Sequence, residues 1–289
     1  KKSLPVKHLL QPASCPNRVA GFYTSTKIMH TNFKQPGLSA RFSLGVGGLL
    51  MLVALWSLGT HWLEANVSLA SLLSPAQTFS SLYELLVQNQ LTLHTLTSLK
   101  RVLVGLGLAL LIGVPVGLAI GASRAIENST STAFQFLRMI SPLSWMPIAV
   151  MVFGIGDAPI YFLLSFAAVW SIILNTASGV KQLDPRWLML AKSLSATRKE
   201  VLLKIILPGV LGHILTGVRL AIGVIWIVLV PCEMLGVSSG LGYFILDTRD
   251  RLAYSELMAV IVLIGALGFI LDGLAQKLYQ HWAHSPGKA

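Results

Sequence analysis

Three ionisable residues stand within or at the edge of long apolar runs of this sequence, and they limit what those runs can do. Arg219 and Glu233 fall in one run, and Asp272 falls in the last run of the chain. An ionised side chain in apolar surroundings is costly unless it faces water, protein or an opposite charge. Two roles for Arg219 stay open: it lines a path for a charged solute, or it is a structural arginine that reaches toward water. For Asp272 we expect a structural pairing, with Lys277 as its partner a little over one turn away.

No residues are arranged for catalysis or for metal binding. The seven histidines are scattered, and the two cysteines, Cys15 and Cys232, have neither zinc-site nor disulfide-framework spacing. A glycine-rich stretch at 236–242 lacks the Lys-Ser/Thr pair that follows in a phosphate-binding loop. We therefore expect no catalytic residue, no metal and no cofactor in this chain.

The longest polar stretch between two apolar runs, residues 181–208, has the residues needed to form short helices. Asp184 before Pro185 is typical of a helix start, because Asp accepts from free N–H groups and Pro suits the first helical position. Thr197 and Glu200 have the spacing of a capping box, which marks a second helix start. A structured, basic and half-apolar loop of this kind is suited to docking. The predicted helices and the bend between them lie at 185–194, 198–206 and 195–196.

The composition is that of a protein with several membrane spans. Of the 289 residues, 54% are hydrophobic and 11% are charged, whereas typical soluble domains have ~25% charged residues. Six apolar runs approach the ~20 residues needed to cross a bilayer. We predict spans at 42–62, 101–122, 134–153, 160–180, 209–235 and 257–277. Small residues every four positions in the second span predict the close approach of another helix, through Gly105, Ala109, Gly113, Gly117 and Gly121.

The positive charges indicate the orientation of these spans. A net charge of +11 could suggest a nucleic-acid partner, but most of the 22 Lys and Arg residues fall in the first tail and the 181–208 stretch. This distribution predicts that both termini and that stretch are cytoplasmic, and we expect no nucleic acid. Residues 64–100 have the weak helical periodicity of an amphipathic segment, which this orientation places on the outer surface. The expected organisation is a basic tail, a first span with the external segment, a core and a second tail, at 1–41, 42–100, 101–277 and 278–289.

The 181–208 stretch resembles the coupling loop of ABC-importer permeases, whose motif is E-A-A, three residues, G, nine residues and I-x-L-P. Met189 and Leu190 depart from the motif, because they stand in place of the glutamate and the first alanine. The resemblance assigns Ala196, at the bend, to contact with an ATPase, with Thr197 and Glu200 holding the second helix rigid. The positions that fall on the motif are Ala191, Ser195 in place of the glycine, Ile205, Leu207 and Pro208.

Two further segments resemble the nitrate, sulfonate and bicarbonate branch of these permeases. The pattern R-x-x-x-P…P…F-G-I-G is matched by Arg138, Pro142, Pro147 and residues 153–156. Residues 230–257 look most like the nitrate-permease subgroup. The resemblance covers residues from about 98 to 272.

The resemblance implies an all-α membrane protein with the six-helix transmembrane domain of type I ABC importers and a cytoplasmic coupling loop. The implied complex is a homodimer of this chain in a bacterial inner membrane, with two ATPase subunits that bind ATP and Mg²⁺ and an extracytoplasmic substrate-binding protein. It would import a small anion by alternating access, with nitrate (and nitrite) first and bicarbonate, cyanate and sulfonate open. Positive charge favours an anion path, so Arg219 is the main pathway candidate, followed by Trp145, Asn175, Trp226 and Glu233.

Two other classes of protein were weighed against this interpretation. An ATP-independent secondary transporter would show paired intramembrane acids or repeated halves, and neither is visible in the sequence. A membrane-embedded enzyme would need clustered His, Asp or Glu at membrane depth, which the scattered histidines do not provide.

Overall fold

The computed structural model describes residues 38–64, 68–88 and 90–283, so most of the predicted first tail and half of the second lie outside the described residues. The chain divides into two units, residues 1–51 and 52–289. The described part of the first unit is the beginning of helix α1 (Leu38–Glu64). All regular structure in the described residues is helical, which confirms the predicted all-α fold class.

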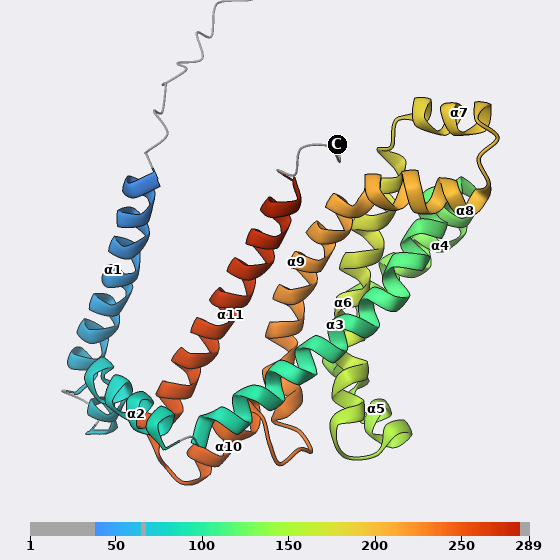
Figure 1. Cartoon of the computed structure of the whole chain (residues 1–289). Coiled ribbons are helices and arrows are strands. Elements are labelled where there is room, and N and C mark those ends of the chain that lie inside the picture. Colours follow the sequence, from blue (N-terminus) through green and yellow to red (C-terminus); the bar gives the residue numbers. More distant parts are fainter. Residues whose placement is uncertain (1–37, 65–67, 89, 284–289) are drawn as a thin grey trace, which may run out of the picture. The chain divides into compact units, whose positions relative to one another are not determined.

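Within the described residues, five helices are long and apolar enough to cross a membrane. Their order matches the predicted first, second, fourth, fifth and sixth spans. The first is α1, and the others, which lie in the second unit (Figure 1), are α3 (Gln90–Ala122), α6 (Asp157–Lys181), α9 (Leu207–Glu233) and α11 (Tyr254–Ala283).

The predicted span at 134–153 is not one regular helix, because that segment is broken into two helices bent by 87°. The break follows from Pro142, which disfavours helical geometry at the preceding residue. Ile140 and Ser141 have ψ values of 126° and 128°, and a short 3-10 turn follows. The segment is therefore one bent span at most, composed of α4 (Arg124–Met139), η2 (Pro142–Trp145) and α5 (Met146–Phe153).

The small residues predicted in the second span do allow a close approach, and the helix they admit is α6. A Cβ added at Gly113 would lie 2.9 Å from Ile172 Cγ2, and one at Gly117 would lie 2.8 Å from the Ile173 carbonyl oxygen. Real Cβ atoms do not come this close, so larger residues would force α3 and α6 apart. The glycine spacing therefore serves the packing of the core.

The main core lies between α3, α6 and α9, where Leu164, Ile172 and Ile225 are fully buried. A second core joins the start of α3 to α11 and to two shorter helices. These are α2 (Pro75–Val87) and α10 (Leu241–Asp250).

The predicted amphipathic segment at 64–100 is correct only in part. Helix α2 follows the short η1 (Ser68–Leu73) and buries Leu85 in the second core. Helix α3, however, begins at Gln90, well before the predicted span start at 101. Arg101 therefore lies inside a helix and not at its end. Leu91, near the start of this helix, is already buried. At the other end of the chain, α11 continues past the predicted limit of 277 to Ala283.

Candidate functional site

The predicted docking loop is folded by the caps that the sequence indicates. The Asp184 carboxylate accepts a hydrogen bond from the Arg186 N–H at 2.9 Å and starts α7 (Pro185–Ser193). Glu200 Oε2 accepts from the Thr197 N–H at 3.0 Å and from its hydroxyl at 2.8 Å. The Thr197 hydroxyl in turn accepts from the Glu200 N–H at 3.4 Å. Both predicted helix starts are confirmed.

The loop turns at the residue that replaces the glycine of the coupling motif. Ser195 has a φ of 54°, a backbone conformation that favours glycine. The turn is held by the Ala196 N–H, which donates to the Ala191 carbonyl at 3.0 Å, and Ala191 is buried. The predicted bend is therefore correct, and Ser195 adopts the conformation for which the motif supplies glycine.

The second short helix of the loop is continuous with a membrane span. It is composed of α8 (Arg198–Val201) and the π-helical η3 (Leu202–Ile206), and α9 begins at Leu207 with Pro208 in its first turn. The loop and α9 therefore form one continuous helical segment.

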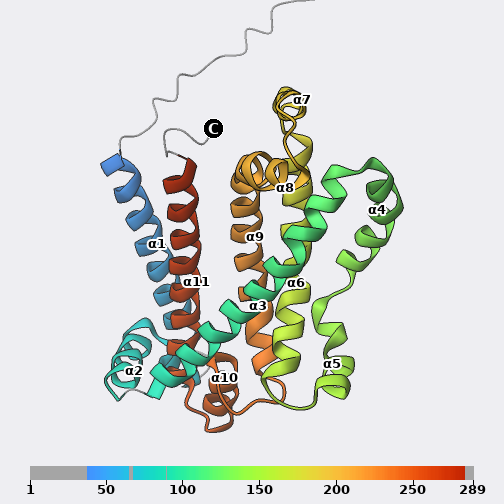
Figure 2. The same cartoon turned by 45° about the vertical axis from the view of Figure 1, so that its right-hand side comes forward.

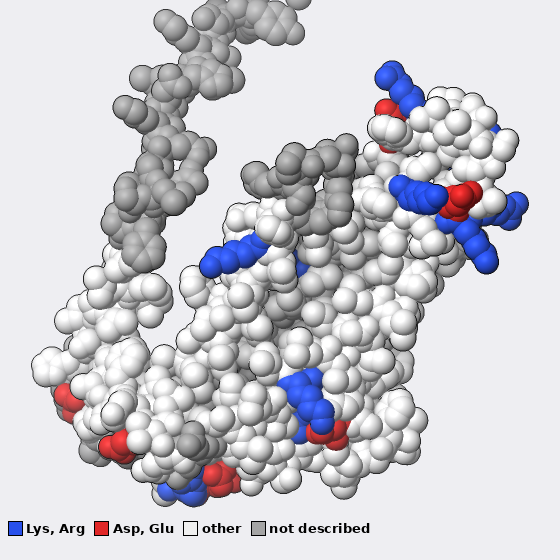
Figure 3. All heavy atoms as spheres, viewed as in Figure 1, with Lys and Arg blue, Asp and Glu red and all other residues white. Residues whose placement is uncertain are grey.

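The loop exposes an apolar surface that the sequence prediction did not single out. Trp187, Leu190 and Leu194 are 55%, 51% and 73% exposed. They line a groove with Ala191 and Ala196. Figure 3 shows charged side chains gathered over this end and along the opposite edge, with an uncharged band between them. An exposed apolar patch with a charged rim is typical of a protein contact.

We predict that Thr197→Val loosens the start of α8, because valine keeps the shape of threonine but cannot make the capping bonds. Amide hydrogen exchange at residues 198–201 should accelerate several-fold when measured by mass spectrometry. Ser193→Ala removes a nearby hydroxyl that bonds only to the Met189 carbonyl, and it should leave these rates unchanged. Equal exchange rates in Thr197→Val and wild type would mean that the capping box does not hold the loop.

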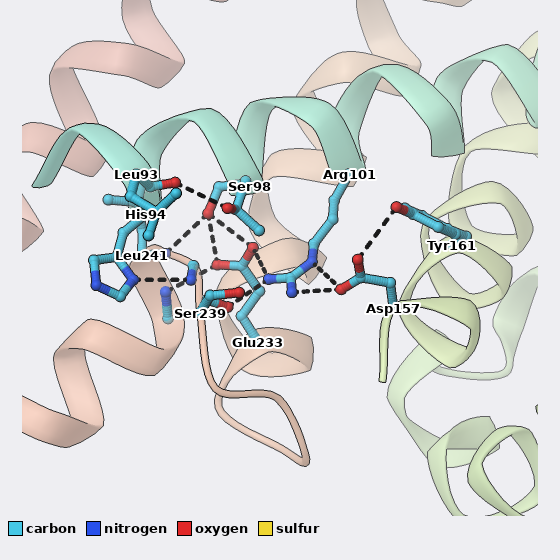
Figure 4. A network of polar contacts seen from close by, with 12 residues as sticks. Leu93, His94, Ser98, Arg101, Asp157, Tyr161, Glu233, Ser239 and Leu241 are labelled. Carbon is cyan, nitrogen blue, oxygen red and sulfur yellow. Dashed lines mark hydrogen bonds and ion pairs between the residues drawn. The ribbon is translucent and has the colours of Figure 1, made fainter. Parts of the chain in front are cut away.

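A buried ionic network occupies the opposite end of the bundle (Figure 4). Arg101 of α3 is 1% exposed, and it donates to Glu233 Oε1 of α9 at 2.7 Å. Its Nε donates to Asp157 Oδ1 at 2.9 Å, at the start of α6. The Ser239 carbonyl accepts from the same guanidinium at 2.7 Å. One arginine thus ties together the three helices of the main core.

The second carboxylate oxygen of Glu233 organises the connection between α9 and α10. It accepts from the Gly242 N–H at 2.9 Å and from the Ser98 hydroxyl at 2.8 Å. The Ser98 oxygen accepts from the Leu241 N–H at 2.9 Å. Gly240 has a φ of 117°, and a Cβ there would lie 2.5 Å from Arg101. The connection therefore fits only with glycine at this position.

Glu233 was predicted to line a solute path, but the structure gives it another environment. It is fully buried and its carboxylate is surrounded by the donors of Ser98, Arg101 and Gly242. Glu233 thus joins α9 to α3 and α10, and its place on a solute path stays a prediction. Arg101 was missed because it was taken as the boundary of a span. The three-residue spacing of Ser98 and Arg101, which places both on one helical face, was the available signal.

The other pathway candidates do not converge on one cavity. The Trp226 indole donates to the Ile264 carbonyl at 3.1 Å, which joins α9 to α11. Asn175 donates to the Ser171 carbonyl of its own helix at 2.8 Å. The Trp145 ring packs against Phe166 with centroids 5.6 Å apart. Their roles in transport stay predictions.

Arg219 pairs with the acid that the sequence assigned to another partner. Its Nε and Nη2 donate to the two carboxylate oxygens of Asp272 at 2.9 and 3.0 Å. The predicted pairing of Asp272 with Lys277 is wrong, because α9 packs against α11 and brings the more rigid guanidinium to the carboxylate. The charge of Arg219 is thereby balanced within the chain.

This pair predicts a distinctive pattern of variants. Arg219→Ala and Asp272→Ala each leave one uncompensated charge in an apolar helix, so each should reduce the yield of folded protein in membranes. Arg219→Ala/Asp272→Ala leaves none and should restore the yield, as measured by gel filtration of a fluorescent fusion in detergent. Restored yield without restored transport would support the pathway role of Arg219. Restoration of both would limit the pair to a structural role.

The helical spans and the structured loop together define a polytopic transport permease, and the described residues contain no group of three His, Cys, Asp or Glu that could hold a metal ion. The chain belongs to the family of binding-protein-dependent transport system inner membrane components, whose model matches residues 109–284. It is thus a multi-pass membrane component of a transport system.

Relatives of this chain are named for different substrates. The bicarbonate transport system permease protein of Synechococcus elongatus is 37% identical over 65% of this chain and 68% of its own length. The nitrate import permease protein of Leptolyngbya laminosa is 35% identical over 61% of this chain and 63% of its own length. The taurine transport system permease protein of Escherichia coli is 32% identical over 81% of this chain and 86% of its own length. These names confirm the predicted branch of the family.

The fold is shared with a solved ABC importer. The inward-facing MetNI methionine ABC transporter aligns with a TM-score of 0.54 and 17% identity, over 64% of this chain and 92% of the MetNI chain. At this identity the similarity concerns the fold alone. It confirms the predicted architecture of an ABC-importer transmembrane domain.

Proposed function

We propose that this chain is the permease subunit of an ATP-driven importer that carries a small, singly charged oxyanion, with nitrate (and nitrite) as first substrate. The observation that carries the proposal is the capped loop from Asp184 to Glu200, which presents an apolar groove and continues directly into α9. A simple solute channel does not require a rigid loop that projects from the bundle. A transporter driven by a partner that moves during a catalytic cycle does require one.

The proposed complex has two copies of this chain, two ATPase subunits and an extracytoplasmic binding protein. Each ATPase subunit would bind the loop groove of one permease copy, and the ATPases would themselves bind ATP and Mg²⁺. The loop end would then face the cytoplasm, and α5 and α10 would face the binding protein on the other side of the inner membrane. The family description, which names a binding-protein-dependent inner membrane component, supports this arrangement.

The geometry suggests how ATP hydrolysis would be coupled to transport. Closure of the ATPases displaces α7 and α8, and the displacement passes into α9 without a flexible joint. Helix α9 is packed against α6, and α6 against α3, so the three helices move together. Arg101 and Glu233 keep the far ends of these helices together. The bundle would then rock as one body and expose the path alternately to either side.

Bicarbonate is the second candidate substrate. The bicarbonate and nitrate permeases named above have similar identities to this chain, 37% and 35%. Nitrate and bicarbonate are both planar oxyanions with a single negative charge, so one site chemistry suits either of them. Because one relative is named for taurine, a sulfonate is a further candidate substrate.

The test is reconstitution of the purified complex in proteoliposomes with its binding protein. Uptake of nitrate, bicarbonate and taurine should be measured with ATP and with a non-hydrolysable analogue. We expect ATP-dependent uptake of nitrate or bicarbonate. Uptake that continues without ATP hydrolysis, or purification of the chain without any ATPase, would contradict the importer and favour a secondary transporter.

A further inference from the structure

A cavity of about 250 Å³ is lined mostly by residues of α4 and α6. Figure 2 shows the course of these two helices. Its α6 wall extends from Trp170 to Lys181, a rise of roughly 16 Å at 1.5 Å per residue. Its α4 wall extends from Glu127 to Arg138. The cavity is therefore elongated along both helices.

Helix α4 has the surface of a helix that faces water or protein and not lipid. None of its residues is buried in the single chain. Hydroxyl and amide side chains need hydrogen-bond partners that lipid tails cannot provide. The Ser129 and Thr130 hydroxyls donate to carbonyls of their own helix. The other side chains of this kind on α4 are Asn128, Ser131, Thr132 and Gln135.

The charges around the cavity are only partly balanced. At one end Lys181 forms an ion pair with Glu127. At the other end Arg138 has no hydrogen-bond or ion-pair partner within the described part of the chain. Arg101 and Arg219, in contrast, are each paired with carboxylates. The cavity thus has one uncommitted guanidinium.

Arg138 is also far from the start of its helix. Helix α4 begins at Arg124, and the 14 following positions place Arg138 roughly 21 Å farther along the helix axis. Arg138 is exposed in the single chain, and a guanidinium within a membrane protein is costly unless it is hydrated or faces an anion.

We propose that this cavity is a binding site for a small, singly charged oxyanion, with Arg138 as the charged donor. The guanidinium fork matches two oxygens of such an anion. Ser131, Gln135 and Ser178 line the same cavity and offer neutral hydrogen-bond donors. The rings of Phe134 and Trp170 form an apolar wall that reduces competition from water.

The size of the cavity limits its occupant. At ~30 Å³ for each water molecule, the volume corresponds to about eight waters. This is enough for a small oxyanion with part of its hydration shell, and too little for a nucleotide. The inference rests on the proposed function and deepens it, because it names the place in the permease where the imported anion is held.

Binding should be measured on the detergent-solubilised complex of permease and ATPases, through the midpoint of thermal unfolding in sodium nitrate against sodium chloride at equal ionic strength. We expect saturable stabilisation of wild type by nitrate. Arg138→Gln should raise the half-saturating nitrate concentration about tenfold or more, because a charged hydrogen-bond donor is lost. Arg138→Lys should retain part of the affinity. Arg124→Gln, on the same helix but outside the cavity lining, should behave as wild type.

Failures of the site and of the proposed function give different results. If wild type imports nitrate or bicarbonate, but Arg138→Gln binds and imports them equally well, the site is wrong and the importer stands. If wild type imports no anion, the proposed function fails, whereas Arg138-dependent nitrate binding would still support the site. If Arg138→Gln does not assemble, Ser131→Ala/Gln135→Leu provides the same comparison.

A lipid phosphate could supply the same oxyanion chemistry, so the measurement has a lipid arm. The delipidated complex should be titrated with nitrate, and separately with phosphatidylglycerol in mixed micelles. Stabilisation by nitrate without added lipid supports the free-anion site. Arg138-dependent stabilisation by phosphatidylglycerol, together with no effect of nitrate, would overturn it.

Discussion

Arg101→Leu should destabilise the protein by about 3–5 kcal/mol, the usual cost of breaking a buried ion pair by removing one partner. The variant leaves Glu233, which is fully buried, without the 2.7 Å charged donor that balances it. It also frees Asp157 and the Ser239 carbonyl from the same guanidinium. The loss should appear as a lower midpoint of thermal unfolding in detergent and as poor accumulation in membranes.

The matched control is Lys100→Gln, which removes an exposed positive charge one residue away. It should leave the unfolding midpoint unchanged. Arg101→Leu/Glu233→Leu should recover part of the stability, because no unpaired buried charge is left. If Arg101→Leu is as stable as Lys100→Gln, the network does not hold the three helices together.

Leu194→Asp should reduce recovery of the ATPase subunits by about thirtyfold when the permease is purified under mild conditions. Leu194 is 73% exposed on the loop groove, where a partner would bury it. Residues at the centre of such contacts contribute about 2 kcal/mol or more, which corresponds to about thirtyfold in affinity. Because the side chain makes little contact within this chain, the fold of the permease should be unaffected.

Ser193→Asp is the charge-matched control, because Ser193 is exposed but does not line the groove. It should keep the ATPases bound and ATP hydrolysis responsive to the binding protein. Equal ATPase recovery with both aspartate variants would place the docking surface elsewhere on the chain, and the importer proposal would lose its central support.

The features that were predicted correctly depend on residues close together in the sequence. Asp184 and Pro185 are adjacent, and Thr197 and Glu200 are three positions apart, so local geometry decides whether they cap a helix. The four-residue spacing from Gly105 to Gly121 likewise requires only one helix to be recognised. The helix that fills this ridge, α6, is a property of the folded bundle.

The features that were missed join residues that are distant in the sequence. Arg101 is separated by 132 positions from Glu233 and by 56 from Asp157. Arg219 is separated by 53 positions from Asp272, whereas the predicted partner Lys277 was a near neighbour. The sequence shows each charge without its partner. Only the packing of α3, α6, α9 and α11 determines which opposite charges pair and so offset the free-energy cost of burying them.

The broken third span was predicted only in part for a related reason. The sequence contains Pro142 and Pro147, which indicate that the helix cannot be regular. The direction and size of a bend depend on what the two halves pack against. Helix α5 packs against α6, whereas α4 leaves the cavity beside it, and the result is the 87° angle between them.

The π-helical segment at Leu202–Ile206 changes the helical phase between α8 of the loop and the span α9, with which it is continuous. Each residue of an α-helix advances the direction of its side chain by about 100°, and a π-helical turn holds one residue more than an α-helical turn. The side chains of α8 therefore stand about 100° away from the directions that an uninterrupted α-helix would give them relative to α9. One surplus residue thus sets the direction in which the loop groove faces around the axis of the span.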